Sequence, residues 1–245
     1  MITLIGTGHV FDLSDALLQV FDELQPDTIC VELDQQRYQQ LLMKRQQQHT
    51  SKKIPRDVPF LYRVLARFQQ NLAKKYGVTP GEEMVTAIQY AQNHQLPMHL
   101  IDMNAQTVFS QMLRNMTLKE KFRLLLSGVG GLFVSQKRVE TELDKIQGDF
   151  TSYLDQIGKK FPTIKESLID KRNLFMVNKL LQLNKEFDQI AVCVGDGHIP
   201  GMSLLLEKEQ VAVETIRLKQ LQDMPKKDFD PSSASFHVQY HHDDG

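Results

Sequence analysis

Two four-residue stretches of this sequence share the pattern glycine, any residue, glycine, histidine. Gly6-Thr7-Gly8-His9 follows the apolar run ITLI, and Gly195-Asp196-Gly197-His198 follows IAVCV. Such runs are typical of buried parallel strands, whose carboxyl ends form the binding crevice of the sheet. Imidazoles bind metals and transfer protons, and glycines allow tight turns and close approach of a ligand. We therefore expect His9 and His198 to share one site, with Gly8 and Gly197 beside the ligand.

A carboxylate ends a third apolar run, TICVEL, where Glu32 interrupts the hydrophobic series. Next to two imidazoles, Glu32 could hold a divalent cation or act as a general base on water. The alternative is an ion pair between Glu32 and Arg37 that only fixes a helix to the sheet. Two histidines and a carboxylate suit manganese, cobalt or zinc better than calcium, so the predicted metal ligands are His9, Glu32 and His198.

Two further polar clusters lie on expected helices. Glu83 belongs to an acidic first turn, where it complements the helix dipole or contributes to the site. Arg172 and Asn173 lie within a long helical segment. They form either an ordinary exposed face or a group that binds anions and carbonyls in the crevice, and periodicity does not decide between the two.

The patterning of apolar residues predicts an α/β fold, with a mostly parallel central sheet, crossover helices and a large helical insertion at about 105–187. We expect a single domain over 1–221 and a polar, disordered tail over 222–245. Predicted strands cover 2–6, 28–33, 97–102, 189–195 and 211–216, and predicted helices cover 14–25, 35–48, 60–76 and 80–94. Helix caps are expected at Ser14, Thr79, Thr117 and Thr163.

Composition restricts the classes of partner. A net charge of −1 gives no general attraction to nucleic acid, so the basic stretch 49–59 is interpreted as a solvated loop. The apolar stretch 124–134 is too short and glycine-rich to span a bilayer, and we expect a cytoplasmic protein without an integral membrane segment. Cys30 and Cys193 lie in apolar runs and are expected to be small buried hydrophobes. The histidine-rich tail is interpreted as a flexible surface segment, in preference to a metal site.

Five motifs occur in a fixed order, namely GTGHV, VELDQQR, PGEEM, KRN..M and VGDGHIPGM. In this order and spacing the chain resembles the TraB/PrgY family of pheromone-shutdown proteins, which is related more distantly to the GumN and Tiki proteins. The resemblance covers most of 1–221 and implies an α/β fold whose sheet carries the active-site histidines. By way of the Tiki relatives it also implies metal-dependent peptidase chemistry. The residues that carry over are His9, Glu32, Arg37, Glu83, Arg172, Asn173 and His198.

The chain departs from the family pattern at two points. Family members usually have an arginine after the aspartate of the third strand, where this chain has Asp102-Met103-Asn104. Many members also continue into C-terminal membrane helices, which this sequence does not contain.

Together these features predict a metal-dependent hydrolase that acts on a peptide or another small molecule, with a homodimer left open. The predicted catalytic residues are His9, Glu32, His198 and Arg172. The predicted substrate-binding residues are Arg37, Glu83, Asn173, Gly8 and Gly197. The alternative is a non-catalytic protein that sequesters a peptide pheromone in the same crevice. A third interpretation, phosphate binding by the glycine turns, is weaker because neither motif continues into a P-loop or a dinucleotide fingerprint.

Overall fold

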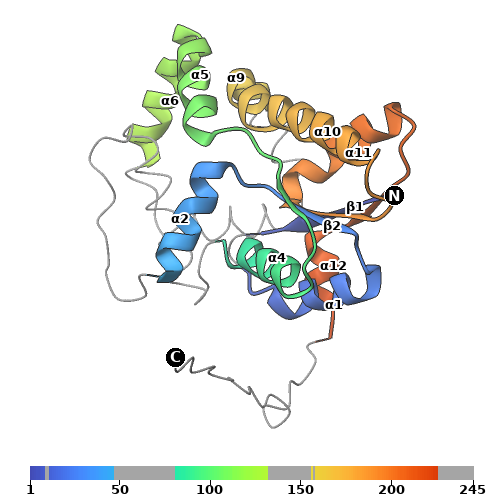
Figure 1. Ribbon diagram of the computed structural model, residues 1–245. Helices are drawn as coiled ribbons and strands as arrows, with labels where there is room; N and C mark the ends of the chain where they lie inside the picture. Colours follow the sequence, from blue (N-terminus) through green and yellow to red (C-terminus); the bar gives the residue numbers. More distant parts are fainter. Residues whose placement is uncertain (9–10, 47–80, 132–155, 157, 226–245) are drawn as a thin grey trace, which may run out of the picture.

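The computed structural model describes residues 1–8, 11–46, 81–131, 156 and 158–225. Its centre is a sheet that lies between layers of helices (Figure 1). The sheet has five parallel strands in the order β3-β2-β4-β1-β5. The strands are β1 (Ile2–Thr7), β2 (Thr28–Val31), β3 (Met98–Leu100), β4 (Ile190–Gly195) and β5 (Val213–Ile216). Every predicted strand is present, and the α/β fold with a parallel sheet is confirmed.

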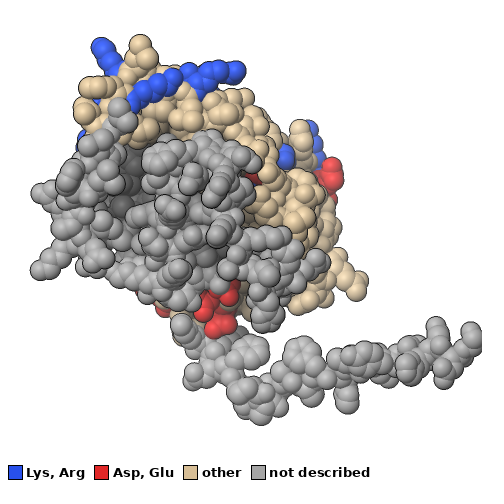
Figure 2. All heavy atoms as spheres, turned by 90° about the vertical axis from the view of Figure 1, so that its left-hand side faces the viewer, with Lys and Arg blue, Asp and Glu red and all other residues tan. Residues whose placement is uncertain are grey.

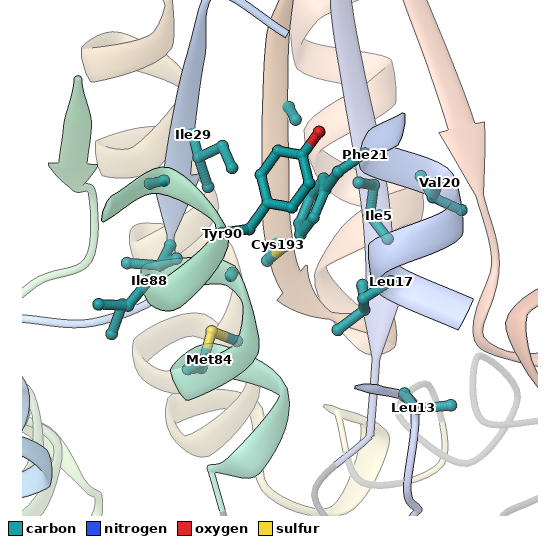
Figure 3. Packing of buried hydrophobic residues seen from close by; sticks show 14 of the residues in the cluster. Ile5, Leu13, Leu17, Val20, Phe21, Ile29, Met84, Ile88, Tyr90 and Cys193 are labelled. Carbon is teal, nitrogen blue, oxygen red and sulfur yellow. The ribbon is translucent and has the colours of Figure 1, made fainter. Parts of the chain in front are cut away.

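Helices cover both faces of this sheet. On one face α1 (Ser14–Leu24), α4 (Glu82–Asn93) and α12 (Leu218–Asp223) enclose an apolar core that includes Phe21, Met84 and Cys193 (Figure 3). On the other face α10 (Lys171–Leu183) and α11 (Ile199–Lys208) pack on residues such as Leu4 and Val192. Burial on both faces explains why β1 and β4 are almost continuously apolar.

The described part of the expected helical insertion is mostly helical. It contains α5 (Ala105–Asn115), α6 (Leu118–Gly131), α9 (Pro162–Lys165) and a π-helical turn η1 (Glu166–Asp170) that continues directly into α10. A further helix, α2 (Gln35–Gln46), follows β2. The expected helix up to Tyr76, the loop at 49–59 and the tail from 226 onward lie outside the described residues. Regular structure in α12 extends past the predicted boundary at 221, and Met224 packs on the core.

Two of the predicted caps behave differently from expectation. Ser14 is the first residue of α1, and its backbone N–H donates to Asp12 Oδ1 at 3.3 Å while its hydroxyl accepts from Thr86. Thr163 lies inside α9 and bonds to Glu120, and Glu166, the expected partner, forms an ion pair with Lys171. The predictions of Ser14 and Thr163 as caps were therefore wrong.

Other local predictions were partly right. The reciprocal capping box of Thr117 and Glu120 is confirmed, with bonds of 3.2 and 2.9 Å. Helix α4 begins later than expected, after Gly81 at a φ of 89°, a left-handed conformation that favours glycine. Helix α2 contacts the core through Tyr38 and Leu41, whereas Leu42 has a relative exposure of 37%.

None of the helices that the structure describes combines the length and the apolar character needed to cross a membrane.

Candidate functional site

The carboxyl ends of β1, β2 and β4 lie next to one another at one edge of the sheet. The two glycine-histidine motifs are offset by one residue there, because Thr7 is paired with Gly195 and Gly6 with Val194. After Gly195 the chain turns into a short 3-10 helix, η2 (Asp196–His198), which places His198 at the strand end as expected. His9 lies outside the described residues, so its approach to His198 stays a prediction.

Glu32 is the centre of a buried polar cluster at this edge. Its Oε2 accepts a hydrogen bond of 2.6 Å from the Gly195 backbone N–H, and its Oε1 forms an ion pair with Arg172. His198 Nε2 lies 3.5 Å from the same Oε1. Burial alone would raise the pKa of Glu32, but His198, Arg172 and the Gly195 N–H hold that pKa well below its ordinary value. Glu32 is therefore an ionised carboxylate inside the protein.

The other nitrogen of His198 is held by Asn173. Asn173 Oδ1 lies 2.6 Å from His198 Nδ1, and both side chains are buried. A side chain at Gly201 would prevent this contact, since a Cβ atom there would lie 2.3 Å from Asn173 Nδ2. The PGM part of the second motif therefore allows α11 to pack closely on α10 at the point where Asn173 meets His198.

Two arginines and two carboxylates continue the cluster outward from Glu32. Arg172 donates to Asp102 at 2.9 and 2.6 Å, and Arg37 contacts both Asp34, at 2.8 Å, and Asp102. The alternative of a Glu32–Arg37 ion pair was wrong. Asp34 accepts from the backbone at the start of α2 and holds Arg37 there, so Glu32 pairs with Arg172.

Asp102 was missed as a member of this site. It joins the two arginines, and its side chain is 1% exposed. Its position directly after the third strand, at the same sheet edge as Glu32, was the signal that could have identified it.

Arg172 and Asn173 point into the site and do not form an exposed face. They lie at the start of α10, directly after the π-helical turn η1, and Arg172 Nη1 donates to the Leu168 carbonyl in that turn at 3.0 Å. Single π-turns within helices occur frequently at functional sites. The turn η1 directly precedes the segment that carries both residues, and their side chains point toward the end of β2 and toward η2.

The structure also describes the positions of the other predicted substrate-binding residues. Glu83 is buried in the first turn of α4, on the opposite face of the sheet from α10. At Gly8 a Cβ atom would meet Leu218 at 2.9 Å, and Gly197 lies within the 3-10 turn η2. Of the glycines that the structure describes, Gly81 alone has a positive φ, so left-handed backbone does not explain the described glycines of either motif.

Asp196, the second residue of GDGH, joins the two ends of the chain. Its carboxylate accepts from Arg217 at 2.8 and 2.6 Å and from the backbone N–H of Leu218 at 2.9 Å. A Cβ atom at Gly6 would lie 2.3 Å from Asp196 Oδ1. The first glycine of GTGH therefore makes room for a side chain of the other motif.

Both cysteines are confirmed as small buried residues without a disulfide. They face opposite layers of the core, Cys30 toward α10 and α11 and Cys193 toward α1 and α4. Burial raises the pKa of Cys30 to about 12 and raises the pKa of Cys193 as well. Neither thiol is a nucleophile at neutral pH, because the thiolate is the reactive form.

The described residues contain no group of three or more His, Cys, Asp or Glu side chains that could hold a metal ion. Glu32 and His198 bring one carboxylate oxygen and one ring nitrogen together. The predicted third ligand, His9, is outside the described part of the chain. The chemistry of the pair fits a transition metal, and completion of the site depends on His9.

Comparison with known proteins identifies the family of this chain. The model of the TraB/PrgY/gumN family matches residues 1–215. The uncharacterized protein MJ1365 of Methanocaldococcus jannaschii is 31% identical over 220 residues, which cover 84% of this chain and 53% of that protein. The chain thus spans about half the length of this curated relative. Because the family model matches most of the chain and includes every residue of the Glu32 cluster, the chain belongs to the TraB/PrgY/gumN family.

Proposed function

We propose that this protein is a metal-dependent hydrolase that acts on peptides, with His9, Glu32 and His198 as ligands of manganese, cobalt or zinc. One observation carries the proposal. His198 Nε2 faces Glu32 Oε1 at 3.5 Å while His198 Nδ1 is held by Asn173 at 2.6 Å.

Hydrogen-bond chemistry makes this arrangement informative. The Asn173 carbonyl oxygen only accepts, so Nδ1 of His198 carries a proton. In the neutral ring Nε2 then presents a lone pair to Glu32 Oε1, which is also an acceptor. Two acceptors that face each other favour a positive charge between them, either a proton on Nε2 or a shared cation. A histidine whose second nitrogen is fixed by another side chain is the usual form of a metal ligand.

The surrounding side chains fix these two groups. Arg172 and the Gly195 N–H orient the Glu32 carboxylate and keep it ionised. All three guanidinium nitrogens of Arg172 contact protein oxygens, so we assign it to positioning Glu32 and not to contact with the substrate. A bound divalent ion would supply Lewis acidity toward the scissile carbonyl.

The second candidate is a non-catalytic peptide-binding protein that uses the same sheet edge. It is favoured by the contacts of Glu32, whose two oxygens already accept from Arg172 and the Gly195 N–H. A carboxylate with these partners is satisfied without a metal, and Arg172 competes with any cation for Oε1.

Turnover separates the two candidates. Metal-stripped protein is incubated with a peptide pool, with and without manganese, cobalt or zinc, and new peptide termini are identified by mass spectrometry. The hydrolase gives metal-dependent termini, and His198→Ala lowers their rate at least about a hundredfold. His94→Ala is the matched control, since His94 stacks on Tyr90 in α4. Depletion of peptides without new termini would support the binding protein.

Metal binding is measured separately by thermal unfolding. An ion at a hundred times its dissociation constant stabilises the folded state by about 2.7 kcal/mol. Glu32→Gln and His198→Ala should each reduce this shift. The measurement uses a chain in which His237, His241 and His242 of the tail are replaced by alanine. Identical melting of this chain with and without each metal would rule out the metal-dependent mechanism.

A further inference from the structure

One surface of α6 exposes three large apolar side chains in a row. Leu118, Phe122 and Leu126 have relative exposures of 83%, 63% and 56%. At a spacing of four residues they occupy an arc of about 80° on the helix. The opposite side of α6 carries Glu120, which is buried against α9. Helix α6 is therefore anchored on one side and presents an apolar stripe to solvent on the other.

Positive charges border this stripe. Lys119 and Arg123 lie along one edge of it and Lys121 along the other, and all three are exposed. Arg123 donates to the Lys160 carbonyl at 2.7 Å, which brings the exposed pair Lys159 and Lys160 beside α6. Figure 2 shows lysines and arginines gathered at the end of the molecule where Figure 1 places α5 and α6.

Negative charge is almost absent from the same region. Over residues 105–131, 156 and 158–164 the sequence contains one acidic residue, Glu120. Glu120 is buried, and both of its oxygens accept hydrogen bonds from Thr117 and Thr163. The exposed charge here is positive, although the whole chain has a net charge of −1.

We propose that Leu118, Phe122 and Leu126, with Lys119, Lys121 and Arg123, form a docking surface for an anionic lipid bilayer. A helix with an apolar stripe between cations lies in the plane of the membrane interface. Its apolar side chains enter the acyl boundary, and its cations contact lipid phosphates. We name these six residues the α6 face.

Charge and side-chain type argue against other occupants of the α6 face. A symmetric contact with a second copy of this chain would bring the same cations together, and like charges oppose association. Single-stranded nucleic acid is bound by stacking on aromatic rings, whereas two of the three apolar residues are leucines. A bilayer with anionic headgroups is complementary to both parts of the surface.

Binding to vesicles tests this assignment with the full-length chain. Wild-type protein should sediment with phosphatidylcholine vesicles that contain about 30 mol% phosphatidylglycerol, and only weakly with pure phosphatidylcholine. Lys119→Gln with Lys121→Gln should weaken binding about fivefold per cation removed. Phe122→Ser with Leu126→Ser should weaken it by more than about tenfold. Leu204→Ser in α11 removes an apolar residue of 53% exposure and should leave binding unchanged.

Three results would overturn the assignment. The first is that the Phe122 and Leu126 double variant binds vesicles as well as the wild type does. The second is that the wild type binds neutral and anionic vesicles equally. The third is that the wild type binds no vesicles and forms a dimer in light scattering, which the double variant abolishes. Circular dichroism checks that each variant is folded. If the serine double variant does not fold, the assignment is tested by the glutamine double variant and by the comparison of neutral with anionic vesicles. The inference does not rest on the proposed hydrolase, and His198→Ala should bind vesicles like the wild type.

Discussion

Two buried glutamates in this protein have similar exposure and very different surroundings. Glu32 is 7% exposed and Glu120 is 5% exposed. Glu120 accepts four hydrogen bonds of 2.9 Å from backbone N–H groups and hydroxyls of Thr117 and Thr163. Glu32 contacts the charged Arg172, the titratable His198 and a single backbone N–H.

The difference separates a structural carboxylate from one that can take part in chemistry. Neutral donors surround Glu120 and join the starts of α6 and α9, so it has no partner that changes its charge. Burial would raise the pKa of Glu120, but the hydrogen bonds from Thr117 and Thr163 lower it to about 2. The low pKa of Glu32 depends on the charges of neighbouring side chains, one of which can exchange protons or bind a metal.

The largest expected effect follows from removing the charge opposite Glu32. Arg172→Met leaves Glu32 buried without a guanidinium and Asp102 with that of Arg37 alone, and the free energy of unfolding at pH 7 should fall by about 3–5 kcal/mol. Urea denaturation measures the loss. Arg37→Met is the matched control. Its side chain is 30% exposed and Arg172 still covers Asp102, so the loss should be about 1 kcal/mol.

The pH dependence of this loss has a definite sign. Because the folded-state pKa of Glu32 is lowered, its contribution to stability is present above the ordinary glutamate pKa and is lost as the pH falls. The difference between wild type and Arg172→Met should therefore shrink below about pH 4. Equal losses for Arg172→Met and Arg37→Met would show that Glu32 does not depend on its charged neighbour.

A second variant disturbs the site through packing. Gly201→Ala places a Cβ atom against Asn173 and should cost about 1–3 kcal/mol in the free energy of unfolding. It should also remove the hydrogen bond between Asn173 and His198, seen as loss of the slowly exchanging His198 Nδ1 proton by NMR. In an Asn173→Ala background the space is open and the same change should cost less. An equal loss of unfolding free energy in both backgrounds would show that the alanine side chain clashes with residues other than Asn173.

The sheet could be predicted from sequence because buried parallel strands are short apolar runs that end at glycine or a carboxylate. The same patterns identified Glu32 and His198 at strand ends. The partner of Glu32 could not be predicted, since the choice between Arg37 and Arg172 depends on how α2 and α10 meet the sheet. Asp102 could have been identified from its position after the third strand, but its two arginine partners could not.

Capping-box patterns also fail to predict the partner of a side chain where a tertiary contact decides it. Thr117 and Glu120 match a capping box and form one. Thr163 and Glu166 match it equally well, yet Thr163 bonds to Glu120 from a different helix. A local pattern predicts local partners, and tertiary contacts replaced them at Thr163.

The third variant tests the structural carboxylate. Glu120→Gln keeps one acceptor oxygen and loses the other together with the charge at two helix starts, so the free energy of unfolding should fall by about 1–2 kcal/mol. The pKa of Glu120 is lowered to about 2, so its contribution is present above the ordinary glutamate pKa and is lost as the pH falls toward 2. Denaturation across this range should show the wild type and variant converging. If Glu120→Gln lost metal-dependent stabilisation or peptide cleavage, the assignment of a purely structural role to Glu120 would be wrong.

The smallest effect is expected at Asp196, which lies in the GDGH motif itself. Asp196→Asn keeps an acceptor for the Leu218 N–H and loses the ion pair with Arg217, whose side chain is 40% exposed, so the cost should be at most about 1 kcal/mol. Because Asp196 joins the motif to α12 and not to Glu32, the shift of the melting temperature by manganese, cobalt or zinc should equal that of the wild type. Glu32→Gln should reduce the same shift. If Asp196→Asn reduces it as strongly, Asp196 belongs to the ligand set, and the motif contributes two ligands where the proposal has one.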